Sequence, residues 1–144
     1  MTFFLSCESQ APGAGLLMQY HNLTQPLLNT LSNRDYGPEL TEISIITIFL
    51  SDELLKDGGY PERRLFLRKE RAADLRLRLN YRQFLTATPN ARVELYCSHI
   101  LDSIDALRKK VSRDFRFHDL VRDVKALLDH PEFQSELTAI HRFP

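Results

Sequence analysis

The stretch "RRLFLRKERAADLRLRLNY", residues 63–81, decides the predicted fold, because basic and apolar side chains alternate along much of it. In an extended strand, successive side chains point to opposite faces of the sheet. This geometry gathers one apolar face, made of Leu75, Leu77, Leu79 and Tyr81. It gathers a polar and charged face opposite, made of Asp74, Arg76, Arg78, Asn80 and Arg82. The stretch therefore predicts a hairpin of two strands, about 63–69 and 74–82, joined near residues 70–73.

Two more strands are expected before this hairpin. The segment "TEISIITIFLSDELL", residues 41–55, contains a β-branched run with few polar interruptions. Such a run is typical of a strand that is buried on both faces, near the centre of a sheet. The start of the chain, "MTFFLSCESQ", alternates Phe3, Leu5 and Cys7 with polar residues, which also indicates a strand.

A helix is expected between these two strands. Apolar residues recur at spacings of three and four from Leu16 to Leu31, which predicts an amphipathic helix. Pro26 lies inside this segment and removes a backbone hydrogen bond, so we expect either a kink or two short helices. In the second case, Thr24 would cap the second helix.

The rest of the chain is predicted to be helical. Thr88 is a suitable cap for a helix with Pro89 at its first position, and an apolar face then follows the helical period to Val111. Cys97 falls on this face, which predicts a buried and unreactive thiol. Asp114 would cap another helix, with an apolar face of Phe117, Leu120, Val121, Val124, Leu127 and Leu128. A last short helix would begin at Pro131, with Phe133 and Leu137 facing inward.

Together these elements predict an α+β fold in two layers. A mostly antiparallel sheet of about four strands would pack against three or four helices. A chain of 144 residues fits one ordinary domain with one hydrophobic core, so we expect a single domain over residues 1–144. The arginine side of the hairpin would then lie on the open face of the sheet.

The net charge is zero, with 19 basic and 19 acidic residues, but the charges are unevenly distributed. Residues 1–61 carry two basic and seven acidic side chains, whereas residues 62–82 carry eight basic and three acidic ones. Because nucleic-acid binding depends on how many phosphates a protein neutralises, a neutral chain with one basic stripe argues against that partner. The start of the chain lacks the basic lead of a signal peptide, and no segment is apolar enough to span a membrane. We therefore expect a soluble, cytoplasmic protein, in which Cys7 and Cys97 are free thiols.

No pattern in the sequence indicates an active site. The five histidines do not pair with one another or with cysteine at metal-binding spacing, and no phosphate-binding loop or nucleophile elbow is present. His118 beside Asp119 is the one candidate acid–base pair, but adjacent residues of a helix point in different directions. We expect no catalytic residue, no metal and no cofactor.

Two charged faces are candidates for binding a partner protein. The first is the arginine face of the hairpin, with Arg64, Arg68, Arg71, Arg76, Arg78 and Arg82. Arginine is favoured at interfaces, although an exposed charged sheet face also serves solubility alone. The second is an acidic face made of Glu39, Glu42, Asp52, Glu53 and Asp57, which would suit a partner protein with a cationic cleft.

Several segments carry a resemblance to a known family: "FFLSCE", "RDYGPELTEISIITIFLSDE", "ERRLFLRKERAADLRLRLNYRQFL", "ILDSIDALRKK" and "DFRFHDLVRDVKALL". Together they span nearly the whole chain, and they resemble the bacterial immunity proteins of immunity family forty-four. These proteins protect cells from their own polymorphic or contact-delivered toxins. The resemblance implies a cytoplasmic protein, without enzymatic activity or cofactor, that binds and blocks one cognate toxin C-terminal domain.

Three hypotheses of function follow. The leading one is an immunity protein that neutralises a toxin domain, possibly a nuclease, by stoichiometric binding. The second is a nucleic-acid-binding regulator that inserts the arginine hairpin into a groove as a β-ribbon. The third is a small enzyme that uses His118 and Asp119.

Overall fold

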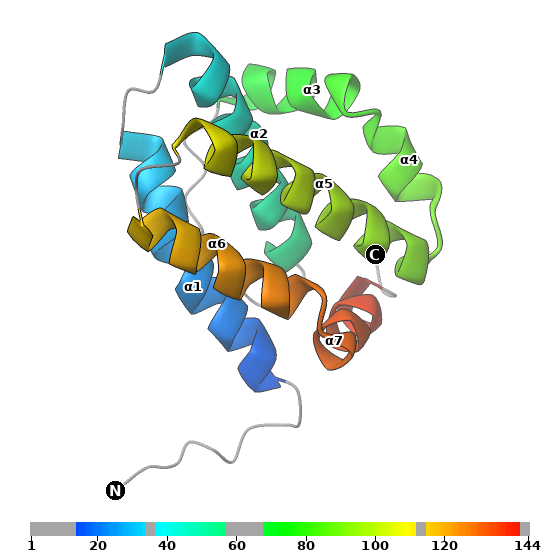
Figure 1. Ribbon diagram of the computed structural model, residues 1–144. Coiled ribbons are helices and arrows are strands. Elements are labelled where there is room, and N and C mark those ends of the chain that lie inside the picture. Colours follow the sequence, from blue (N-terminus) through cyan, green and yellow to red (C-terminus); the bar gives the residue numbers. More distant parts are fainter. Residues whose placement is uncertain (1–13, 34–36, 57–67, 112–114, 142–144) are drawn as a thin grey trace, which may run out of the picture.

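Helices account for all the regular structure in the part of the chain that the computed structural model describes, which is residues 14–33, 37–56, 68–111 and 115–141 (Figure 1). The elements are α1 (Ala14–Asn33), α2 (Gly37–Leu55), α3 (Lys69–Arg78), α4 (Tyr81–Thr86), α5 (Pro89–Lys110), α6 (Phe115–Leu128) and α7 (Pro131–His141). The α2 helix packs along α5, and α1 packs against both α2 and α6. The short helices α3 and α4 lie at the upper right edge of the molecule in Figure 1.

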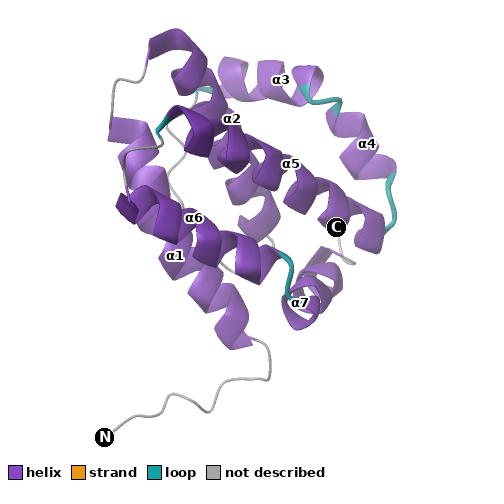
Figure 2. Ribbon diagram, in the orientation of Figure 1, coloured by secondary structure: helices purple, strands orange, loops and turns teal. Residues whose placement is uncertain are grey.

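The predicted α+β fold is therefore wrong. No strand occurs among the described residues, as Figure 2 shows. The strand expected at Phe3–Cys7 lies outside those residues, as do residues 63–67 of the first hairpin strand. The remaining strand predictions fall on α2, α3 and α4, and each failed for a physical reason.

The segment predicted to be the central strand is most of α2, a helix with a wide buried surface. Phe49, Leu50 and Leu54 are fully buried. Apolar residues therefore cover more than one narrow face of the helix, and the sequence does not show the 3.6-residue spacing typical of an amphipathic helix. Two of its hydroxyl groups donate within the helix, Ser44 Oγ to the carbonyl of Leu40 at 2.7 Å and Thr47 Oγ1 to that of Ile43 at 2.9 Å. A short apolar β-branched run does not distinguish a buried helix from a buried strand by pattern alone.

Most of the second predicted hairpin strand forms the end of α3. Its leucines alternate with polar residues as in a strand, but they also fit the spacing of a helix. Leu75 is fully buried, and Ala72 and Leu79 pack against the core beside it, at spacings of three and four. Leu77, which a strand would bury with Leu75, is instead 81% exposed. Asn80 then adopts a left-handed conformation with φ of 55° and ends the helix before α4 begins.

The α1 helix runs through Pro26, so the alternative of two short helices is wrong. Thr24 does not act as a cap. Its hydroxyl donates to the carbonyl of Tyr20 at 2.7 Å, four residues back within the same helix.

Two helix starts were predicted correctly. Thr88 caps α5, because its hydroxyl oxygen accepts a hydrogen bond from the amide of Ala91 at 3.3 Å. The α7 helix begins at Pro131 as expected, with Phe133 and Leu137 buried. The predicted cap Asp114 lies outside the described residues.

A cluster of buried apolar side chains joins all seven of these helices, and α3 and α4 each insert one fully buried residue, Leu75 and Phe84. Arg92 of α5 ties the neighbouring segments together, since its Nε donates to the carbonyl of Phe84 at 3.0 Å and its Nη1 to that of His141 at 3.3 Å. Among the described helices, none combines the length and the hydropathy that crossing a membrane requires.

Candidate partner-binding surface

The arginines of α3 form ion pairs with the glutamates of α2. Arg71 Nη2 and Arg78 Nη1 donate to the two carboxylate oxygens of Glu42, one to each. Arg71 also donates to Asp74 of its own helix at 2.8 Å. Burial alone would raise the pKa of Glu42, but the hydrogen bonds from Arg78 and Arg71 outweigh it and hold the pKa below its ordinary value.

Glu53 holds a second and more buried set of contacts. Its side chain is only 4% exposed, and Arg76 Nη2 lies 3.2 Å from its Oε1. The hydroxyl of Tyr81 and, at 3.2 Å, the ammonium of Lys56 donate to its other oxygen. Since a buried carboxylate without partners is costly, these donors make the burial of Glu53 tolerable and fix α3 and α4 to α2.

Aromatic side chains surround this ion pair. The guanidinium carbon of Arg76 lies 5.4 Å from the ring centroids of both Phe49 and Tyr81, within the range of a cation–π contact. The Tyr96 hydroxyl lies 3.4 Å from that of Tyr81. Burial, and then the hydrogen bond to Glu53, raise the pKa of Tyr81, which therefore stays a neutral donor.

The two predicted faces therefore largely satisfy each other. Of the six predicted arginines, Arg71, Arg76 and Arg78 pair with the acidic residues of α2, and Arg64 lies outside the described residues. Only Arg68 and Arg82 are exposed without an ion pair to any described residue.

The acidic face is equally dispersed. Glu42 and Glu53 are engaged by α3, and Glu39 pairs with Lys110 at 3.1 Å. Asp52 is buried, and Asp57 lies outside the described residues. The structure does not present these five residues as one acidic surface.

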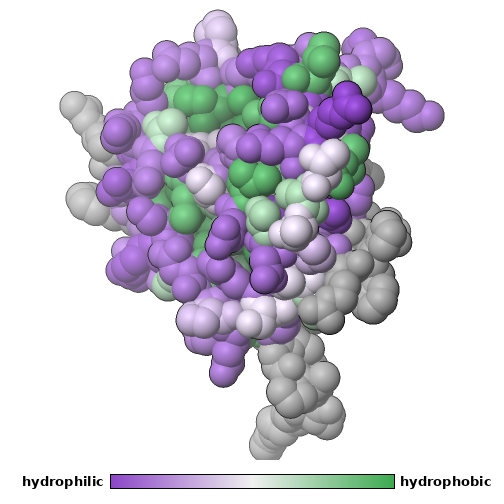
Figure 3. Space-filling model, turned by 90° about the vertical axis from the view of Figure 1, so that its right-hand side faces the viewer, coloured by the Kyte–Doolittle hydropathy of each residue, from purple (hydrophilic) through white to green (hydrophobic). Residues whose placement is uncertain are grey.

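The sequence did not predict the exposed leucines on the outward surface of α3 and α4, although Arg68 and Arg82 on this surface were among the predicted arginines. We call residues 68–86, which contain both helices, the arm. Leu77 is 81% exposed and Leu85 is 61% exposed, and the third large hydrophobic residue that is exposed in the described chain, Met18, lies on α1. Arg68, Lys69 and Arg82 are the exposed cations of the arm. Figure 3, which faces the right-hand side of Figure 1, shows hydrophobic patches bordered by hydrophilic residues on that side.

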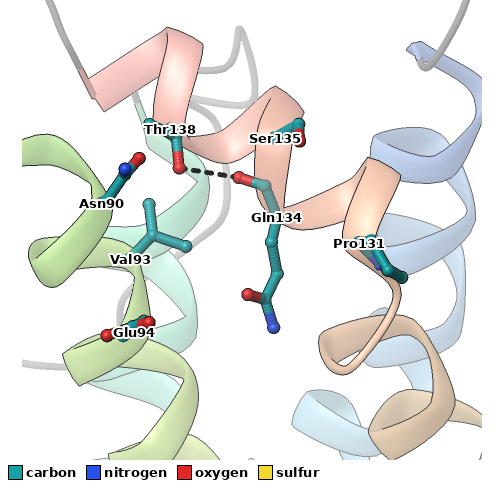
Figure 4. A pocket seen from close by; sticks show the side chains of 7 residues that line it. All are labelled: Asn90, Val93, Glu94, Pro131, Gln134, Ser135 and Thr138. Atoms are coloured by element: carbon teal, nitrogen blue, oxygen red, sulfur yellow. Dashed lines mark hydrogen bonds between the residues drawn. The ribbon is translucent and has the colours of Figure 1, made fainter.

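Two grooves lie elsewhere on the molecule. One, of about 440 Å³ between α5 and α7, is lined by Asn90, Val93, Glu94, Pro131, Gln134, Ser135 and Thr138 (Figure 4). Its Thr138 hydroxyl donates to the carbonyl of Gln134 at 2.8 Å, so the hydroxyl is held by its own helix. The other, of about 620 Å³, lies between α1 and α6 and includes Asp123 and His130. His130 Nδ1 accepts from the amide of Glu132 at 3.2 Å, and Asp123 pairs with Arg122 at 3.3 Å.

Neither the proposed acid–base pair nor a metal site is supported by the geometry. Asp119 is exposed, and its carboxylate contacts Arg122 at 3.3 Å. Within the described ranges, no three His, Cys, Asp or Glu side chains are grouped so that they could hold a metal ion. Cys97 is buried and free, as predicted; burial, followed by the charges of Asp129 and Glu94, raises its pKa to about 12.

Comparison with known proteins identifies the family. The model of the family described as immunity protein 44 (Imm44) matches residues 1–130 of the chain. The chain belongs to the Imm44 family. This match confirms the resemblance drawn from the sequence segments. No curated protein and no solved structure matched the chain.

Proposed function

We propose that this Imm44 protein binds a cognate toxin C-terminal domain in the cytoplasm of the producing cell and neutralises it by stoichiometric, non-catalytic association. Family membership over residues 1–130 is the observation that carries this proposal. The contacts of the arm also support it. Arg76 and Tyr81 bind Glu53 and so hold α3 and α4 to α2, which orders this surface before a partner binds. Because this surface is already ordered in the free protein, binding avoids the entropic cost of fixing loops at the interface.

Two features of the earlier hypotheses lose their support. The nucleic-acid regulator required a β-ribbon, and the residues expected to form its second strand lie in α3, in α4 and in the turn between them. The idea that an acidic face meets the cationic cleft of a nuclease required Glu42 and Glu53 to be available, but both are paired with arginines of the arm. Neither feature therefore enters the proposal.

The direct test is protection of growth. The toxin C-terminal domain encoded beside the gene for this chain would be produced in a sensitive bacterium, with and without the full chain. We expect the toxin domain alone to stop growth, co-production to restore it, and the two proteins to copurify at one to one. Growth arrest despite equal production of the chain, with no copurification, would contradict the proposed function.

A further inference from the structure

We infer that the outer face of the arm is the surface that docks the toxin domain, and that it meets an acidic protein patch with an apolar centre. This inference rests on the proposed function and names the site through which it acts. Its key residues are Leu77, Leu85, Arg68, Lys69 and Arg82.

Charge separates the two sides of the arm. Residues 68–86 carry six basic and two acidic side chains. Three of the six cations, Arg71, Arg76 and Arg78, form ion pairs with Glu42 and Glu53 of α2 and with Asp74 of the arm itself. Within the described structure, the other three are exposed and make no ion pair. The cations on the inner side of the arm are therefore paired with carboxylates of the same molecule. The exposed cations on the outer side are available to carboxylates of a partner.

The apolar residues of the arm divide in the same way. Leu75 and Phe84 are fully buried against the rest of the molecule, whereas Leu77 and Leu85 project into solvent. Covering exposed leucine side chains contributes favourable free energy, because apolar area leaves water. Cations at the border of such a contact act mainly on the association rate and on the choice of partner.

This combination favours a protein over a nucleic acid. Phosphate binding scales with the number of cations, and here only three are available, with Glu70 exposed among them. The two leucines would gain nothing from a phosphate backbone, but they suit an apolar spot on a protein. Arginine is also the cation best suited to pair with a carboxylate through two parallel hydrogen bonds.

The ion pairs on the inner side make the outer side suitable for recognition. Arg76 and Tyr81 anchor the arm to the buried carboxylate of Glu53, and Arg71 and Arg78 anchor it to Glu42. The outer leucines are thus carried on short helices that are held at several points. A surface that is ordered before binding loses less entropy when a partner docks.

The test is calorimetric titration of the full chain with the toxin C-terminal domain, which is produced separately by cell-free synthesis. The variants Leu77→Ala, Leu85→Ala and Arg82→Glu alter the outer face. Their matched controls are Met18→Ala on α1 and Arg122→Glu on α6, which are also exposed. We expect each arm variant to weaken affinity about tenfold or more, and each control to stay within about twofold of the wild type.

A thermal melt of each free variant checks folding, and only variants that melt like the wild type are compared. Tight binding by the wild type, unaffected by all three arm variants, would overturn the docking surface while leaving the proposed function standing. No binding by the wild type would reject the proposed function itself. Salt-dependent binding of duplex or single-stranded nucleic acid that Arg82→Glu removes, with toxin binding unchanged, would assign this face to nucleic acid and also overturn the inference.

Discussion

Replacing Glu53 by glutamine tests whether a buried carboxylate holds the arm to the helical core. The side chain keeps its shape, but the negative charge that faces Arg76 and accepts from Tyr81 is lost. Because Glu53 is 4% exposed and Arg76 is 40% exposed, the remaining cation regains part of its hydration. Lys56 is about half exposed, so its pairing with Glu53 contributes little.

The expected loss follows from the two stronger contacts. A hydrogen bond to a charged group contributes about 1.5–3 kcal/mol, against roughly 1 kcal/mol for a neutral one. Weakening the contacts with Arg76 and Tyr81 in this way lowers the free energy of unfolding by about 2 kcal/mol. For a chain of this size, about 4 °C of melting temperature corresponds to 1 kcal/mol, so the expected shift is about 8 °C downward.

The assay is thermal and urea unfolding of the full chain, followed by circular dichroism. The matched control is Asp119→Asn, which makes the same chemical change at an ion pair where both side chains are about 70% exposed. Exposed pairs contribute less than about 1 kcal/mol, so the control should melt within roughly 4 °C of the wild type. If Glu53→Gln melts as high as Asp119→Asn, the arm is held by apolar packing alone and the reasoning from the ion pairs is refuted.

Two other predictions concern titratable groups. The carboxylate oxygens of Glu136 are buried and accept no hydrogen bond from the described residues, and burial, together with the charge of Glu132, raises its pKa from 4.5 to about 7. Between these values the folded chain keeps a proton on Glu136 that the unfolded chain has lost, so the contribution of Glu136 to stability should fall as pH rises from about 4.5 to 7. Glu136→Gln should reduce that fall in melts at pH 5 and pH 8, and an equal fall in both proteins would contradict the assignment. In a Cys7→Ser variant, Cys97 should react with a thiol reagent only as fast as the surrounding structure unfolds, because its thiol is buried with a pKa of about 12. Labelling within seconds under native conditions would contradict this prediction, because it would show an accessible thiol.

The sequence predicted the C-terminal helices well because their signals are independent and agree. In α5, the cap Thr88, the proline at the first position and a long apolar period all indicate the same helix. In α2 and α3, the available signals conflicted. The β-branched run of α2 is buried on too many sides to show a period, and the leucines of α3 satisfy both a strand pattern and a helix pattern.

The partner surface was only partly predictable. The arginine stretch was predicted as a candidate partner face, but Arg71, Arg76 and Arg78 pair with glutamates of α2 inside the molecule. The opposite net charges of residues 1–61 and 62–82 were a signal of this pairing, since oppositely charged segments of one chain can satisfy each other. The exposure of Leu77 and Leu85 could not be derived from the sequence, because it depends on which turn of each short helix meets the core.

Hydroxyl-radical footprinting of the full chain, free and bound to the toxin domain, tests most directly the claim that the arm docks the toxin. The method reports the solvent exposure of individual side chains, and the three exposed large hydrophobics, Leu77, Leu85 and Met18, provide two probes and an internal reference. We predict that the complex protects Leu77 and Leu85 from oxidation and leaves Met18 on α1 as reactive as in the free chain. Protection of Met18 with unchanged oxidation of both leucines would contradict the claim and place the interface on the α1 side of the molecule.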